Sequence, residues 1–156
     1  NIVDEAKKDI VLVLEDIRDP GNLGTIIRIA DWYGVKHIFA SVGTVDMFNN
    51  KTIISSMGSF ARVHIQYGDI KESLKQCNEQ KILTIGSVLG AKSSHAYAWP
   101  KTGVLVIGNE ANGISEDVKD LLKNSVTIPS YGDAESLNAG VATAVLLDEW
   151  RRSLNF

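Results

Sequence analysis

The fold is indicated most clearly by residues 104–115, whose sequence is VLVIGNEANGIS. The stretch starts with four consecutive apolar residues, a pattern typical of a strand that is buried on both faces of a sheet. Gly108 and Gly113 bracket a polar turn, and Ser115 with the two acidic residues after it opens a helix. A buried strand that runs through a glycine-bearing turn into a helix indicates an α/β protein with parallel strands.

Similar apolar runs recur along the chain, and segments with a helical pattern separate most of them. We expect strands at residues 10–14, 35–40, 63–66, 82–88, 104–107 and 126–128. We expect helices at 23–33 after an Asn22 cap, at 70–79 after Asp69, after Ser115, and at about 138–154. The alternation predicts one α/β domain over residues 1–156, with a mainly parallel sheet and helices on both faces.

Composition restricts the class of protein. Hydrophobic residues make up 44% and charged residues 22% of the chain, which is ordinary for a globular domain. No apolar run approaches the ~20 residues that cross a bilayer, and no secretory leader is recognisable, so we expect a cytoplasmic protein without membrane partners. The single cysteine, Cys77, excludes an intrachain disulfide, and we interpret it as buried filler. The three histidines lack ligand spacing, so no metal is predicted.

The net charge of −3 is unfavourable for a protein that binds nucleic acid, because phosphate binding depends on clustered lysine and arginine. If RNA is the substrate, a local basic patch or a separate N-terminal RNA-binding domain must supply the attraction.

Arg28 is the first candidate functional residue. On a helical wheel, Leu23, Ile26 and Ala30 belong to an apolar stripe, and Arg28 points roughly 160° from its centre. Arg28 is therefore free to meet a substrate. The alternative is a solvated arginine that pairs with Asp31, a contact of little energetic weight.

Two further stretches have the character of ligand sites. Gly108 and Gly113 follow a buried strand, where open α/β sheets bind ligands, and glycine permits close approach to the backbone. The stretch is not a GxGxxG motif, so a dinucleotide site is disfavoured. In residues 126–138, Ser136 or Asn138 can cap the last helix. The small residues that follow either admit a ligand or simply allow close packing.

Together, and in this order, the three stretches resemble the motifs of SpoU-type (TrmH-like) methyltransferases of the SPOUT superfamily. Asn22 and Arg28 match the first motif, Gly108, Asn109, Glu110 and Gly113 the second, and Ile128, Pro129, Ser136, Leu137 and Asn138 the third. The resemblance spans residues 10 to about 150. It implies a C-terminal deep trefoil knot, S-adenosyl-L-methionine as cofactor, an RNA substrate (rRNA or tRNA), and a homodimer.

The resemblance also implies an activity, transfer of a methyl group from S-adenosylmethionine to a ribose 2'-hydroxyl, and roles for particular residues. The catalytic set is Arg28, Asn22, Glu110, Ser136 and Asn138. The residues expected to bind the cofactor are Leu89, Gly108, Asn109, Gly113, Ile128, Leu137 and Ala142. The arginine that matches Arg28 is often described as a general base. Because arginine stays charged at neutral pH, we favour phosphate binding and stabilisation of the developing alkoxide.

Two other functions remain open on the residues alone. One is a non-catalytic RNA- or nucleotide-binding α/β module, which suits the acidic charge. The other is a flavodoxin-like domain that binds a mononucleotide at helix N-termini.

The 23–33 helix also predicts a dimer with a composite active site. Ile29 and Trp32 project roughly 100° and 160° from its apolar stripe, so each needs a cover. A partner chain docked there would bring its loops beside Arg28, with Trp150 as a further anchor. The alternatives are an intrachain loop as the cover, or a single exposed aromatic residue that needs none.

Overall fold

The computed structural model describes residues 1–154, in which six strands form one sheet. The strands are β1 (Ile10–Leu14), β2 (His37–Ser41), β3 (His64–Gly68), β4 (Thr84–Ser93), β5 (Gly103–Ile107) and β6 (Asn124–Thr127). Every pairing is parallel, in the spatial order β3-β2-β1-β5-β4-β6. The predicted parallel α/β fold is confirmed, although individual strand ends differ by a few residues.

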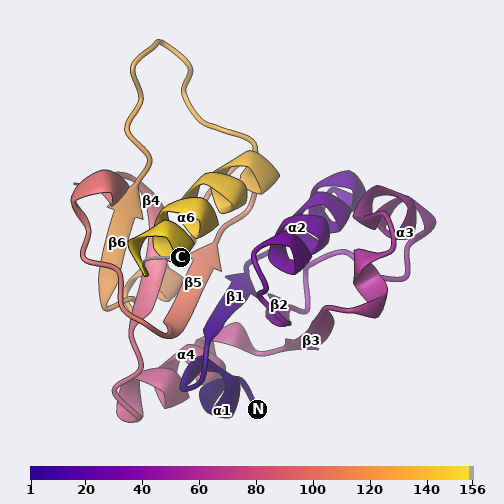
Figure 1. Ribbon diagram of the computed structural model, residues 1–156, viewed down its shortest axis with the longest axis horizontal. Helices are drawn as coiled ribbons and strands as arrows, with labels where there is room; N and C mark the ends of the chain where they lie inside the picture. Colours follow the sequence, from indigo (N-terminus) through magenta and orange to yellow (C-terminus); the bar gives the residue numbers. More distant parts are fainter. Residues whose placement is uncertain (155–156) are drawn as a thin grey trace.

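The strands alternate with helices (Figure 1). The α-helices are α1 (Ile2–Ala6), α2 (Pro20–Trp32), α3 (Asn50–Ser56), α4 (Ile70–Glu79), α5 (Glu116–Lys119) and α6 (Ala139–Ser153). Two short 3-10 turns are η1 (Ser59–Ala61) and η2 (Ser94–Ala96). Four α-helices match the predicted ones, whereas α1 and α3 are additional and too short for a clear helical period.

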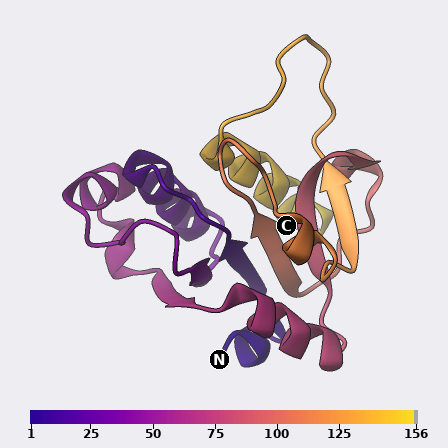
Figure 2. The same ribbon diagram turned by 180° about the vertical axis from the view of Figure 1, so that it is seen from behind.

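The sheet separates two apolar cores, which explains the unbroken apolar runs in its central strands. In β1, Leu12 and Leu14 pack with α2 and α6, while Val11 and Val13 pack with α1 and α4 on the other face. Figures 1 and 2 show these two sides of the sheet. Helices therefore cover both faces, as predicted. Cys77 belongs to the second core, and burial raises the pKa of its thiol to about 11.

The start of α2 differs from the prediction. Asp19, and not Asn22, is the N-cap: its side chain accepts a hydrogen bond from the Asn22 backbone N–H at 2.7 Å. Pro20 takes the first helical position, where a missing N–H costs nothing. Asn22 therefore lies within the first turn, and its side-chain amide is available for other contacts.

The end of the chain corrects a second prediction. Trp150 is not an exposed interface anchor, because it is fully buried in the first core. Its ring stacks on Trp99, and its indole N–H donates to the carbonyl of Pro100 at 2.6 Å. The segment after β4 thus folds over α6, a long-range contact that a helical wheel does not show.

Asn138 caps α6 as expected, accepting hydrogen bonds from the backbone N–H groups of Gly140 and Val141. An exposed loop connects β6 to this cap and forms the arch at the top of Figure 1. A knotted path is not visible within residues 1–154 (Figures 1 and 2), so the knot stays a prediction.

Strand order determines where a ligand can bind. β1 pairs with β2 on one side and with β5 on the other, and the chain leaves β1 toward β2. The carboxyl ends of β1 and β5 therefore flank the point at which the connections change direction. Ligands of open α/β sheets bind at such a point.

Candidate functional site

The loops after β1 and β5 meet at the side chain of Glu110. The Asn22 side-chain amide donates to Glu110 Oε1 at 3.1 Å. The backbone N–H groups of Arg18 and Asp19 point at the same carboxylate, at longer N···O distances of 3.5 and 3.4 Å. Glu110 is thus held as an acceptor beside the first turn of α2.

Asn138 extends this contact to the third motif. Its side-chain amide donates to Asn22 Oδ1 at 2.7 Å, while its own Oδ1 caps α6. Glu110, Asn22 and Asn138 therefore form a continuous series of hydrogen bonds, which we call the polar chain. The polar chain joins three stretches that are far apart in the sequence.

A cavity of about 560 Å³ opens next to the polar chain, where β5 and β6 end and beside the middle of β4. The seven residues expected to bind the cofactor all line it: Leu89, Gly108, Asn109, Gly113, Ile128, Leu137 and Ala142. Glu110 and Ser136, from the expected catalytic set, line it as well. The cavity is large enough for a nucleoside-sized ligand.

Some lining residues were not expected from the sequence. They include Ser87, Val88, Thr127 and Tyr131. Thr127 is the last residue of β6, and Ser87 and Val88 close the predicted 82–88 strand, although β4 continues to Ser93. Their proximity to strand ends was the available signal. Tyr131 carried no such signal, because it lies in the exposed arch before α6.

Gly108 and Gly113 were predicted to let a ligand approach the backbone, but the structure also gives each glycine a role in the shape of the turn. A Cβ at Gly108 would lie 2.2 Å from the backbone carbon of Gly113, so the first glycine allows two backbones to touch. Gly113 has φ +67°, a conformation that favours glycine, and a Cβ there would meet open space. Both glycines therefore shape this turn, which borders the cavity.

Arg28 lies apart from this cavity. It is exposed on α2, and it lies about 9 Å along the helix axis from Asn22. The alternative pairing with Asp31 is wrong, because Asp31 accepts hydrogen bonds from Arg62 Nε and Nη2 at 2.9 and 2.6 Å. Within residues 1–154, the Arg28 side chain is free for an external partner.

Asp31 is instead a structural anchor. Its contacts with Arg62, and the hydrogen bond that it accepts from Ser59, hold the pKa of its carboxyl below the ordinary value of 3.8. They join α2 to the turn η1.

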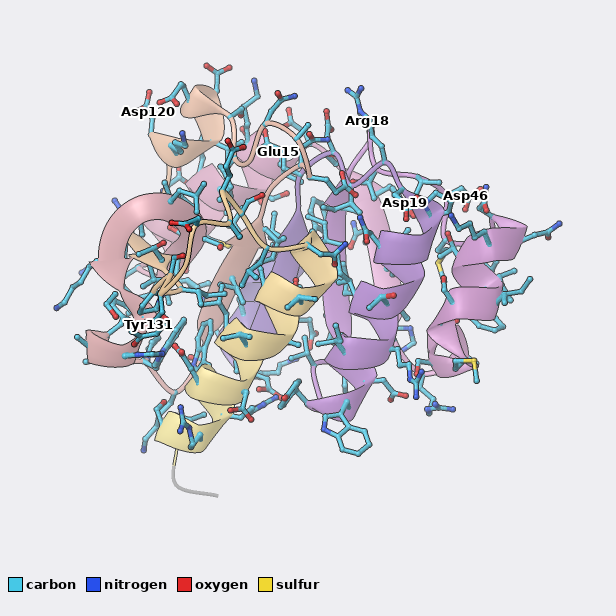
Figure 3. All side chains as sticks on the ribbon, turned by 90° about the horizontal axis from the view of Figure 1, so that it is seen from above. Glu15, Arg18, Asp19, Asp46, Asp120 and Tyr131 are labelled. Atoms are coloured by element: carbon cyan, nitrogen blue, oxygen red, sulfur yellow. The ribbon has the colours of Figure 1, made fainter. Side chains whose placement is uncertain are left out.

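The rim of the site carries mixed charge. Arg18 lies 3.4 Å from Asp16, and Lys51 lies 3.5 Å from Asp19. Figure 3 shows Glu15, Arg18 and Asp19 along this rim, with the Arg18 side chain pointing outward. Each of these two cations is therefore paired with a carboxylate, which lowers the net positive charge that they present to RNA.

The described residues 1–154 contain neither a cluster of metal ligands nor a candidate membrane span. No group of three or more histidine, cysteine, aspartate or glutamate side chains is arranged to hold a metal ion there. No helix there has both the length and the apolar character that a membrane span requires.

Comparisons with known proteins agree on one family. Residues 9–148 match the SpoU rRNA Methylase family. The chain is 31% identical to the 23S rRNA (guanosine(2553)-2'-O)-methyltransferase RlmP of Bacillus subtilis, over 88% of this chain and 56% of that protein. It is 30% identical to the tRNA (guanosine(18)-2'-O)-methyltransferase of Thermus thermophilus, over 92% of this chain and 75% of that protein.

A solved structure, the AdoMet-bound rRNA methyltransferase from Sinorhizobium meliloti, has the same fold. It superposes with a TM-score of 0.87 at 31% identity, over 96% of this chain and 58% of that one. The chain spans little more than half the length of this protein and of the Bacillus relative.

Proposed function

The chain belongs to the SpoU rRNA methylase family, and from that membership we propose that it transfers a methyl group from S-adenosylmethionine to a ribose 2'-hydroxyl of rRNA or tRNA. The observation that carries the proposal is the cavity beside the polar chain, because its lining includes every residue expected to bind the cofactor. The relatives named for rRNA and tRNA methylation support both substrate classes. Their RNA substrates also support a cytoplasmic location.

The chemistry of the cavity fits this cofactor. Apolar side chains of Leu89, Ile128 and Leu137 offer contact surface, and the turn between Gly108 and Gly113 offers backbone polar groups at one wall. A mostly apolar cleft with a few placed polar groups is the usual form of a small-molecule site. When bound, S-adenosylmethionine would supply a methyl group on a positively charged sulfur; the ribose oxygen would take it in an in-line displacement, the C–S bond would break to leave a neutral thioether, and the hydroxyl proton would pass to an acceptor or to water.

The protein's own residues must orient the ribose and stabilise charge on its oxygen. Glu110 faces the cavity and is fixed by the Asn22 amide, so it can accept a hydrogen bond from a ribose hydroxyl. Asn138 holds Asn22 in the orientation that donates to Glu110. Ser136 lines the cavity from the arch and offers a further hydroxyl.

Arg28 would act from outside the cavity of its own chain, and this placement supports a homodimer with a composite active site. In that arrangement the arginine of one protomer faces the cavity of its partner. There it binds an RNA phosphate and stabilises the developing alkoxide, since its guanidinium donates in a fork that matches phosphate geometry.

The mixed charge of the rim supports a protein in which catalysis and most of the RNA binding belong to different surfaces. We propose that residues 1–156 form the catalytic domain and that further basic surface, in a second protomer or an N-terminal RNA-binding domain, supplies most of the RNA affinity.

Methyl transfer can be tested directly. The purified chain, incubated with methyl-labelled S-adenosylmethionine and total RNA from cells that lack the gene, is expected to label RNA at ribose 2'-oxygens. Mapping the 2'-O-methyl positions then identifies the nucleotide. Cofactor binding without label in any RNA would favour a non-catalytic binding module. Binding of FMN in place of S-adenosylmethionine would favour a flavodoxin-like function.

A further inference from the structure

Asp16, the second residue after β1, has a backbone conformation that is uncommon for its residue type. Its φ is +51°, in the left-handed region that favours glycine, and it is one of three such non-glycine residues within 1–154. Asp16 follows Glu15, which Figure 3 labels, in the loop at the carboxyl end of β1.

The side chain of Asp16 is fixed to the end of β2. Its backbone N–H donates to Ser41 Oγ at 2.9 Å, and the Ser41 hydroxyl donates to Asp16 Oδ1 at 2.7 Å. Gly43 also lies against this carboxylate, since a Cβ at Gly43 would lie 2.4 Å from Asp16 Oδ1. This reciprocal pair holds the left-handed conformation in place.

The carbonyl of Asp16 points the other way, toward the cavity turn. It accepts a hydrogen bond from Asn109 Nδ2 at 2.7 Å. The opposite end of the same side chain, Asn109 Oδ1, accepts from the backbone N–H groups of Ala111 and Asn112 at 3.0 and 3.1 Å. The Asn109 amide thus links Asp16 to the whole turn that borders the cavity and carries Glu110.

We infer that Asp16 is a positioning residue for cofactor binding: its left-handed backbone aims its carbonyl at Asn109 and so holds the turn from 109 to 113. The inference rests on the proposed function, since it assigns to that turn the role of a cofactor wall. It differs from a role in charge or acid chemistry, because the group that acts is the main-chain carbonyl.

Three substitutions separate the backbone role from the side-chain role. Asp16→Asn keeps an acceptor for Ser41 and tolerates a positive φ, so its affinity for S-adenosylmethionine should stay within about twofold of wild type. Asp16→Gly keeps the backbone conformation but loses the Ser41 contact, and a loss of about threefold is expected. Asp16→Val disfavours a positive φ, and a loss of tenfold or more, about 1.4 kcal/mol, is expected.

Titration calorimetry on each folded variant gives the affinities, with the folded fraction checked by circular dichroism. Amide NMR of Ala111 and Asn112 reports the turn directly and needs no cofactor. Asp16→Val should shift both amides, and combined with Asn109→Ala it should weaken binding no further than Asn109→Ala alone. Equal affinity of the Val and Gly variants, unshifted amides, or losses that multiply in the double variant would each overturn the inference. No binding by the wild type would contradict the proposed function instead, and the amide shifts would still test the role of Asp16.

Discussion

Asn22 illustrates how the role of one side chain depends on its neighbours. If Asn22 were the helix cap, its side chain would accept a hydrogen bond from a backbone N–H of α2. Because Asp19 caps the helix, the Asn22 amide instead donates to Glu110 and accepts from Asn138. Asp19, three residues before Asn22, thus determines that the Asn22 side chain belongs to the site.

Arg28 is the residue whose loss should affect chemistry most. Arg28→Ala should lower the rate of methyl transfer by at least tenfold, a barrier increase of ~1.4 kcal/mol or more. Affinity for S-adenosylmethionine should stay nearly unchanged, because Arg28 lies outside the cavity. Single-turnover assays and calorimetry give the two numbers. Arg152→Ala, an exposed arginine on α6, is the matched control and should change neither. More than a tenth of the wild-type rate in Arg28→Ala would make this arginine peripheral.

Ala142 offers a test of the cavity that leaves its turn intact. A phenylalanine at this position of α6 would project into the cavity, so Ala142→Phe should weaken S-adenosylmethionine binding more than tenfold, ~1.4 kcal/mol. Calorimetry measures the change. Val141→Phe is the matched control, because Val141 is the adjacent, exposed residue of the same helix and does not line the cavity. Equal affinities of the two variants would place the cofactor elsewhere.

At the scale of elements, the packing of α2 against α3 depends on Gly24. A Cβ there would lie 2.0 Å from Ser55 Oγ and 2.5 Å from the carbonyl oxygen of Thr52. Gly24→Ala should therefore lower the free energy of unfolding by about 2 kcal/mol, measured by urea denaturation. Gly132→Ala is the control, because its Cβ meets nothing within 4 Å, and it should change stability by less than about 0.5 kcal/mol. If Gly24→Ala left the free energy of unfolding unchanged, α3 would be able to shift on α2 to accommodate the added methyl group.

The link between α2 and η1 should make stability depend on pH. The contacts of Asp31 with Arg62 and Ser59 lower the pKa of its carboxyl. A carboxyl with a lowered folded pKa stabilises the fold above its unfolded pKa, and this contribution is lost as pH falls through the folded value. Wild type should therefore lose unfolding free energy more steeply below about pH 4 than Asp31→Asn does. Asp4→Asn, at an exposed carboxyl of α1, should keep the wild-type slope. Parallel curves for wild type and Asp31→Asn would contradict this account.

The sequence predicted elements better than it predicted contacts between them. The apolar run at β5 is unbroken and leads into a glycine-bearing turn and a helix cap, so its strand, turn and following helix were predictable. The helix α3 was not, because seven residues with β-branched and serine side chains give weak helical signals. Trp150 is buried by Trp99 and Pro100, which lie about 50 residues earlier in the chain. The carbonyl of Asp16 accepts its hydrogen bond from Asn109, which lies 93 residues later. No local pattern reports such contacts.

At the scale of the whole molecule, Arg28 lies on an exposed face of α2 and does not line the cavity of its own chain. The face of α2 that contains it lies between two neighbours: Gly24 faces α3, and Tyr33 contacts Asp148 of α6. Trp32 lies on this open face and is 84% exposed. Ile29 is half-buried against the first core, contrary to the expectation that it needs a cover. Trp32 is therefore the exposed apolar residue of this face that a partner chain would cover.

A homodimer docked on this face should place Arg28 of one protomer at the cavity of the other. Light scattering at micromolar concentration should give a dimer for the wild type and a monomer for Trp32→Glu, because burying a charge at an apolar contact is costly. Val42→Glu, at a residue 82% exposed in the loop after β2, should stay dimeric. A wild-type monomer, or a dimeric Trp32→Glu variant, would show that this face is not the interface.

Mixing two inactive variants tests whether the active site is shared. A heterodimer of Arg28→Ala and Glu110→Gln protomers contains one site with both mutations and one with neither, provided that each site takes its arginine from one chain and its glutamate from the other. Activity should then return on mixing, to about a quarter of the wild-type value if chains pair at random. If both residues act within one chain, every site in the mixture carries a mutation and no activity returns. Such an outcome would require Arg28 to reach the cavity of its own chain, which would mean that α2 or the arch before α6 moves when RNA binds.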